Sequence, residues 1–60
     1  MTTYDLYVLD ADSGVILGWH KFEVDDDNAA IEMAQALVRQ PPAELWRGDL
    51  LVKKWEAPSR

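Results

Sequence analysis

The acidic residues of this chain include two short runs that could hold a cation. Asp10-Ala11-Asp12-Ser13-Gly14 has the alternating oxygen ligands with which a calcium-binding loop begins, and Asp25-Asp26-Asp27 supplies three consecutive carboxylates. Such a loop needs a bidentate glutamate at its twelfth position, which here is Lys21. Consecutive carboxylates do not converge on one point unaided. We therefore expect a hairpin turn at the first run, helix capping at the second, and neither a metal nor a cofactor.

This sequence lacks the arrangement of residues that nucleophilic catalysis usually needs. His20 is the single histidine, cysteine is absent, and no serine or second histidine lies near His20 in the chain. We expect His20 on the surface or at a sheet edge, where a pH-responsive role in an interface remains open. Arg47-Gly48-Asp49 matches the tripeptide that integrins bind, but its glycine also suits a hairpin turn, which we favour. The residue inventory predicts that the protein is not an enzyme.

Composition indicates a small acidic globular protein. The chain has 60 residues, 48% of them hydrophobic and 28% charged, with a net charge of -5. We expect one domain over residues 1–60, ordered from about residue 3 to residue 57. The negative charge disfavours nucleic acid and anionic membranes as partners, although Lys53 with Trp46 and Trp55 forms a small aromatic and basic patch. The sequence shows neither a signal-peptide pattern nor an apolar run of membrane-spanning length, which favours a cytoplasmic protein.

Hydrophobic patterning and turn residues predict the order ββαββ. The expected helix follows the Asp25–Asn28 cap, covers Ala29–Arg39, and stops at Pro41-Pro42. The expected strands are Tyr4–Leu9, Val15–Val24, Ala43–Arg47 and Leu50–Glu56, followed by a frayed tail at Ala57–Arg60. The predicted fold is a two-layer α+β arrangement, with one helix packed on a four-stranded, mostly antiparallel sheet.

Strand alternation divides the large side chains between the two sides of this sheet. A Gly48-Asp49 turn pairs Arg47 with Leu50, and then Trp46 with Leu51 and Leu45 with Val52. The side under the helix is expected to hold Leu6, Val8, Ile16, Phe22, Val24, Leu45, Leu50 and Val52, facing a helix stripe of Ala30, Ile31, Ala34, Leu37 and Val38. The open side is expected to hold Tyr7, Leu9, Val15, Leu17, Trp19, Trp46, Leu51 and Trp55. Alternatively, a bulge, for example at Gly18, or a curled sheet brings one or two tryptophans into the core.

The order of elements resembles the β-grasp, or ubiquitin-like, family. The resemblance rests on a hairpin, an acidic helix cap, the Pro41-Pro42 break and the Arg47-Gly48-Asp49 turn between the last strands. The chain is shorter and has no Gly-Gly tail, so conjugation is not implied. Its sequence pattern of an Asp-rich cap, an Ala-rich helix and Glu44-Leu45-Trp46-Arg47-Gly48 resembles that of small uncharacterised bacterial proteins. This resemblance implies no function.

One helix cannot cover both sides of the sheet, so we expect the aromatic side to bind protein. The leading hypothesis is a non-enzymatic interaction module, self-associating as a homodimer. Its predicted contact residues are Leu17, Trp19, Trp46, Leu51 and Trp55. The alternative is a small acidic regulatory or inhibitor protein, antitoxin-like or phage-type, that binds a basic partner through Glu23–Asp27.

Overall fold

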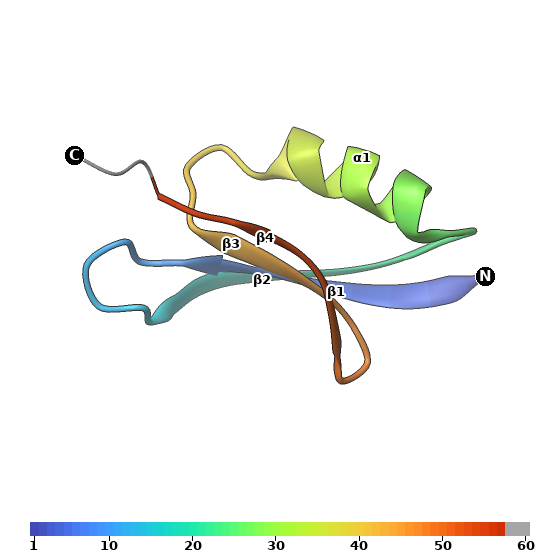
Figure 1. The fold of residues 1–60 in the computed structure, drawn as a ribbon, viewed down its shortest axis with the longest axis horizontal. Coiled ribbons are helices and arrows are strands. Elements are labelled where there is room, and N and C mark those ends of the chain that lie inside the picture. Colours follow the sequence, from blue (N-terminus) through green and yellow to red (C-terminus); the bar gives the residue numbers. More distant parts are fainter. Residues whose placement is uncertain (58–60) are drawn as a thin grey trace.

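The computed structural model describes residues 1–57 of the chain, and it has the predicted α+β architecture. Helix α1 packs along one side of a four-stranded sheet, as Figure 1 shows. The elements in chain order are β1 (Thr2–Leu9), β2 (Ile16–Val24), α1 (Asp27–Leu37), β3 (Ala43–Arg47) and β4 (Leu50–Trp55). Most of the tail predicted to fray lies outside the described residues.

The sheet has the strand order β2-β1-β3-β4, and each neighbouring pair is antiparallel. The two hairpins therefore lie side by side, with β1 and β3 in the centre and β2 and β4 at the edges. A β-grasp sheet has its first and last strands adjacent and parallel in the centre. The resemblance to that family thus extends to the order of the elements along the chain, and not to their order in the sheet.

The acidic run before α1 caps the helix, as predicted. Asp26 is the N-cap residue, and its Oδ1 accepts a hydrogen bond of 2.8 Å from the backbone N–H of Ala29. This bond satisfies one of the N–H groups that the first helical turn leaves unpaired. The helix ends at Leu37, two residues before the predicted end, and the N–H of Val38 closes it on the carbonyl of Ala34. A cis Pro41-Pro42 peptide bond lies in the connection to β3.

The first hairpin is closed by Asp10 and Gly14, which confirms the turn predicted there. The carboxylate of Asp10 accepts hydrogen bonds from the Ser13 hydroxyl, at 2.8 Å, and from the N–H of Asp12, at 3.2 Å. These bonds hold the pKa of Asp10 below its ordinary value of 3.8. Gly14 has a φ of 76°, in the left-handed region that glycine adopts without steric cost. The oxygen atoms of this run therefore stabilise the turn itself.

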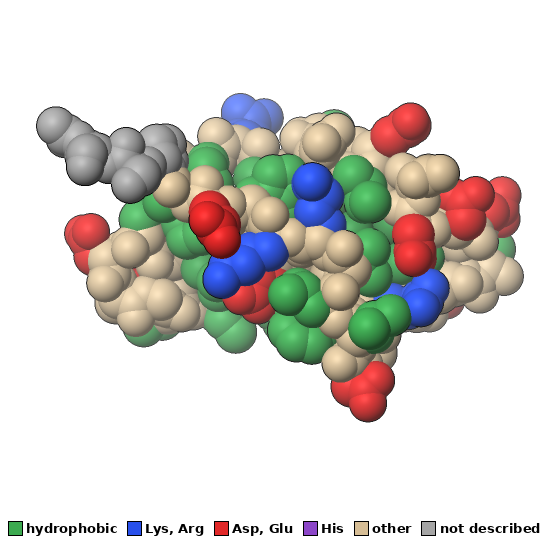
Figure 2. Space-filling model, in the orientation of Figure 1, with side chains coloured by type: hydrophobic (Ala, Val, Ile, Leu, Met, Phe, Trp, Pro, Cys, Tyr) green, Lys and Arg blue, Asp and Glu red, His purple; other side chains and the backbone are tan. Residues whose placement is uncertain are grey.

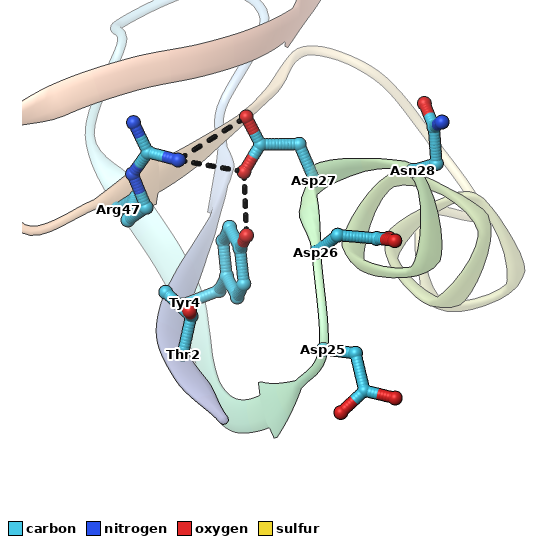
Figure 3. A pocket seen from close by; sticks show the side chains of 7 residues that line it. All are labelled: Thr2, Tyr4, Asp25, Asp26, Asp27, Asn28 and Arg47. Atoms are coloured by element: carbon cyan, nitrogen blue, oxygen red, sulfur yellow. Dashed lines mark hydrogen bonds and ion pairs between the residues drawn. The ribbon is translucent and has the colours of Figure 1, made fainter.

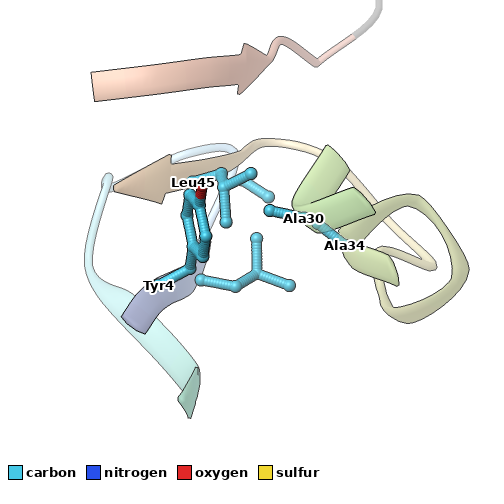
Figure 4. Close-up of a cluster of buried hydrophobic side chains, with 6 residues drawn as sticks. Tyr4, Ala30, Ala34 and Leu45 are labelled. Atoms are coloured by element: carbon cyan, nitrogen blue, oxygen red, sulfur yellow. The ribbon is translucent and has the colours of Figure 1, made fainter. Parts of the chain in front are cut away.

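The core is small, and alanines make up half of its fully buried residues. Tyr4 of β1 and Leu45 of β3 meet the helix there, as Figure 4 shows, and Leu6 of β1 belongs to the same buried cluster. The remaining buried residues are Ala30, Ala34 and Ala43. Tyr4, 1% exposed, was absent from the predicted helix side, although it alternates with Leu6 along the strand. Leu37 and Leu50 were predicted to face the core but are 37% and 49% exposed, because each lies at the end of its element.

A bulge in β4 changes the side on which Trp55 lies. The predicted pairs of Arg47 with Leu50 and of Trp46 with Leu51 are present, but the register then shifts and Leu45 pairs with Lys53. The extra residue puts Trp55 opposite Ala43, and Trp55 packs against the core on the helix side. The prediction that Trp55 lies on the open side is therefore wrong. The alternative, in which a bulge brings a tryptophan into the core, is correct for this residue.

A second bulge lies in β2, beside the glycine that suggested one. Gly18 pairs with Val8, Ile16 pairs with Leu9, and Leu17 is the extra residue between them. Because directly paired residues share a face, Ile16 lies on the side of Leu9, not under the helix as predicted. Ile16 is 55% exposed. The two bulges together explain the residues that simple strand alternation assigned to the wrong side.

Candidate interaction surface

The side of the sheet opposite α1 carries two rows of side chains that cross all four strands. The strand register defines both rows in the order β2, β1, β3, β4. One row is Trp19, Tyr7, Glu44 and Lys54, and the other is Lys21, Asp5, Trp46 and Leu51. We call these eight residues the open face. No other element of residues 1–57 covers it, so its outer surface meets solvent (Figure 1).

Both indoles of the open face are held by carboxylates of the same face. Nε1 of Trp19 donates to Asp5 at 3.1 Å, and Nε1 of Trp46 donates to Glu44 at 3.0 Å. Each bond fixes the direction in which a ring lies, which lowers the conformational entropy that binding would remove. The rings also gain a polar partner without burying their apolar surface. The two indole rings of the open face are therefore held in place within the single chain.

The structure separates the five predicted contact residues into three settings. Trp19 and Leu51 lie on the open face and are 58% and 42% exposed. Trp46 lies on the same face, on a central strand, and is half-buried. Leu17 lies at the β2 bulge, beyond the two rows, and is 68% exposed. Trp55 packs against the core on the other side, so the structure does not bring it together with the rest.

An apolar extension continues from the open face toward the first hairpin turn. Val15 and Ile16 are 58% and 55% exposed, and Leu9 pairs with Ile16. Hydrophobic side chains reach the surface between scattered acidic and basic groups in the region of the strands below α1, as Figure 2 shows. A monomer with a small core gains little by exposing such residues in one region, so they mark a surface suited to contact.

A separate polar cluster lies where α1 begins, and Figure 3 shows it. Asp27 accepts a hydrogen bond from the hydroxyl of Tyr4, and its carboxylate pairs with Nη1 of Arg47 at 3.0 and 3.3 Å. The bond to Asp27, with burial of the ring, raises the pKa of Tyr4 above its ordinary value of 10.0. The cluster joins β1, the end of β3 and the helix. The Arg47 side chain therefore makes a structural contact with the start of the helix.

A pocket of about 380 Å³ opens beside this cluster and is lined by Thr2, Asp25, Asp26 and Asn28 as well. Acidic side chains gather at this end of the molecule, where β2 leads into α1 (Figure 2). Asp26 caps the helix and Asp27 pairs with Arg47, whereas Asp25 is exposed and takes part in neither contact. Within residues 1–57 no three acidic or histidine side chains are placed to hold a metal ion.

The remaining candidate residues of the sequence lie apart from one another. His20 is exposed on the edge strand β2, as predicted, and pairs with Leu6 in the register. Nζ of Lys53 lies 5.6 Å from the centroid of the Trp55 ring, on the helix side. Trp46 lies on the opposite side, so the predicted patch of Lys53 with both tryptophans does not form. Gly48 has a φ of 63°, which fits the predicted turn at Arg47-Gly48-Asp49.

Sequence reasoning missed the charged half of the open face. Lys21, Asp5, Glu44 and Lys54 lie between the aromatic residues, and two of them bind the indoles. One signal was available in the sequence: Glu44 and Trp46 are two residues apart in one strand and so share a side. Asp5 and Trp19 come from different strands, and only the pairing register brings them together. The open face could therefore be predicted as aromatic but not as charge-balanced.

No family model, curated protein or solved structure matches this chain in sequence or fold. Within the described part, α1 is too short and too polar to cross a membrane. The geometry of the open face therefore carries the functional argument alone.

Proposed function

We propose that this protein is a non-enzymatic interaction module that self-associates through its open face. The observation that carries the proposal is the uncovered set of large side chains on one side of the sheet: Tyr7, Trp19, Trp46 and Leu51. Tryptophan and tyrosine in such positions supply much of the binding energy of protein interfaces. The expectation of a bacterial, cytoplasmic protein rests on the sequence, and we keep it as part of this proposal.

The size of the core supports self-association. Three of the six fully buried residues are alanines, which contribute little apolar area. A domain of this length buries only about 60% of its unfolded surface, and domains of this size commonly need a disulfide, a metal or a partner. The sequence has no cysteine, and residues 1–57 place no metal-binding cluster. A second copy would add apolar contact on the side that α1 leaves uncovered.

Sedimentation equilibrium of the wild-type protein from micromolar to millimolar concentration tests the proposal. We expect the apparent mass to rise from one to two protomers, with a blue shift of tryptophan emission. Leu51→Ser should shift the equilibrium toward monomer. Met33→Ser is the matched control, because Met33 is 43% exposed and Leu51 42%, but Met33 lies on α1. A monomeric wild type at all concentrations, or disruption by Met33→Ser and not by Leu51→Ser, would overturn the proposal.

The alternative function, an acidic protein that binds a basic partner through Glu23–Asp27, has less support. Asp26 and Asp27 are engaged within the molecule, and Arg47 neutralises part of the local charge. Glu23 and Asp25 remain exposed for such a role. Binding of a basic peptide that disappears in high salt, and with Asp25→Asn, would support it. Binding that survives high salt would exclude the charge mechanism.

A further inference from the structure

The two rows of the open face repeat the same order of chemical types in opposite directions. From β2 to β4, one row runs Lys21, Asp5, Trp46, Leu51: basic, acidic, aromatic, apolar. From β4 to β2, the other row runs Lys54, Glu44, Tyr7, Trp19, which is again basic, acidic, aromatic and a large apolar ring. A half-turn about an axis perpendicular to the sheet therefore exchanges residues of like type.

This order lets the open face meet the open face of a second copy without bringing like charges together. If a second copy docks face to face about a two-fold axis along the strands, Lys54 lies over Trp19 of that copy and Glu44 over its Tyr7. Asp5 then lies over Trp46 and Lys21 over Leu51. A two-fold axis across the strands gives Lys21 over Trp19 and Glu44 over Trp46. In both arrangements each charge meets an aromatic or apolar residue, and no two like charges are stacked.

The charges of the open face favour a second copy over a strongly charged partner. The whole chain has a net charge of -5, whereas the eight residues of the open face carry two lysines and two carboxylates, and so no net charge. The net charge of this face therefore gives no repulsion between two copies that meet there. A nucleic acid or a highly basic protein finds no excess of opposite charge there, and electrostatic complementarity selects partners.

The carboxylates of the open face can be covered without losing their hydrogen bonds. Asp5 and Glu44 each accept an indole N–H within their own copy, at 3.1 and 3.0 Å. Docking therefore leaves neither carboxylate without a hydrogen-bond partner. A buried carboxylate without such a partner would weaken binding. The two lysines lie on the edge strands and are exposed. Their ammonium groups can stay in water while their stems cover the aromatic rings, with a cation–π contribution to Trp19.

We propose that the open face docks onto the open face of a second copy about a two-fold axis in the plane of the interface, with charged residues against aromatic ones. This inference rests on the proposed function and specifies its partner and its geometry. It differs from pairing of two β2 edges, which would leave the β3 and β4 residues of the open face out of contact.

Charge reversal of the open face tests the inference by sedimentation. Lys54→Glu gives each face a charge of -2, and Glu44→Lys gives it a charge of +2. Each variant alone should dimerise at least about tenfold more weakly than the wild type, because like-charged faces then meet. An equimolar mixture should recover dimerisation as a heterodimer. Arg39→Glu and Glu32→Lys are the controls, because they make the same charge changes at exposed positions outside the open face. Circular dichroism verifies that each variant is folded.

The outcomes separate the failure of the inference from the failure of the proposed function. A wild type that dimerises while both variants dimerise equally well would show that copies meet elsewhere, for example at the β2 edge. Two weakened variants whose mixture stays monomeric would show that the open face is needed but does not dock onto itself. Either result overturns the inference. A wild type that is monomeric throughout overturns the proposed function as well.

Discussion

At the scale of single residues, Tyr4 connects the sheet to the start of α1. Its hydroxyl donates to Asp27, and this bond raises the pKa of Tyr4 above 10.0. The folded state therefore holds the phenol proton more tightly than the unfolded chain does. Its contribution to stability is complete below about pH 10, and it is lost as the pH rises through the raised pKa.

Tyr4→Phe should lower the free energy of unfolding near neutral pH, because the hydrogen bond to Asp27 is lost. Between about pH 8 and about pH 11, however, the variant should lose less stability than the wild type, since it has no phenol proton to lose at this site. Urea unfolding at both pH values measures the difference. An unchanged pH dependence in Tyr4→Phe would contradict the coupling.

The acidic run before the helix allows a second residue-scale prediction. Asp26→Ala removes the cap of α1 and should lower the free energy of unfolding by about 1 kcal/mol. Asp25→Ala, one position earlier, removes an exposed carboxylate that does not cap the helix, and should change stability by less than about 0.5 kcal/mol. Thermal or urea unfolding measures both. Equal effects of the two substitutions would show that the acidic run contributes to stability through its overall charge and not through the helix cap.

At the scale of the elements, the β4 bulge gives Trp55 and Trp19 different roles. Trp55 packs against the core, whereas Trp19 is 58% exposed on the open face. Trp55→Ala should lower the free energy of unfolding by about 2 kcal/mol, less than for a fully buried tryptophan. Trp19→Ala should cost less than about 0.5 kcal/mol under conditions in which the protein is monomeric. Urea unfolding at low protein concentration measures both. A larger loss for Trp19→Ala than for Trp55→Ala would contradict the pairing register of β3 with β4.

The elements also show where prediction from sequence succeeds and where it stops. Strand β3 was predicted with its observed bounds, and α1 within two residues, because alternation, capping and proline act locally. The positions of the bulges at Leu17 and in β4 were not predictable in detail. A bulge depends on how two strands fit each other and the helix, and it reverses every side chain beyond it. This reversal moved Ile16 to the open side of the sheet and Trp55 to the helix side.

The open face was predicted in part for the same reason. Trp46 and Leu51 follow from alternation within the second hairpin and Tyr7 from alternation within the first, and each lies on the side expected. The pattern of charges across four strands follows from the pairing of β1 with β3, which joins residues about 40 positions apart in the chain. Local sequence does not specify that pairing. The order of charged and aromatic residues across the face therefore became visible only in the sheet.

At the scale of the whole molecule, self-association should couple to folding. A ligand that binds only the folded state stabilises it by mass action, and a second copy acts as such a ligand. The wild-type urea midpoint should therefore rise with protein concentration, whereas that of Leu51→Ser should not. Fluorescence-detected unfolding over a dilution series measures this. A wild-type midpoint that is independent of concentration would mean that the single chain is stable without its copy.

If two copies meet through their open faces, residues of these faces come into contact between copies. In a sample that mixes isotopically labelled with unlabelled protein, isotope-filtered NMR detects only the contacts that cross between copies. We expect such contacts for the rings of Trp19 and Trp46 and for the methyl groups of Leu51. Contacts confined to α1 or to the β2 edge, or no contacts between copies at millimolar concentration, would contradict docking through the open faces.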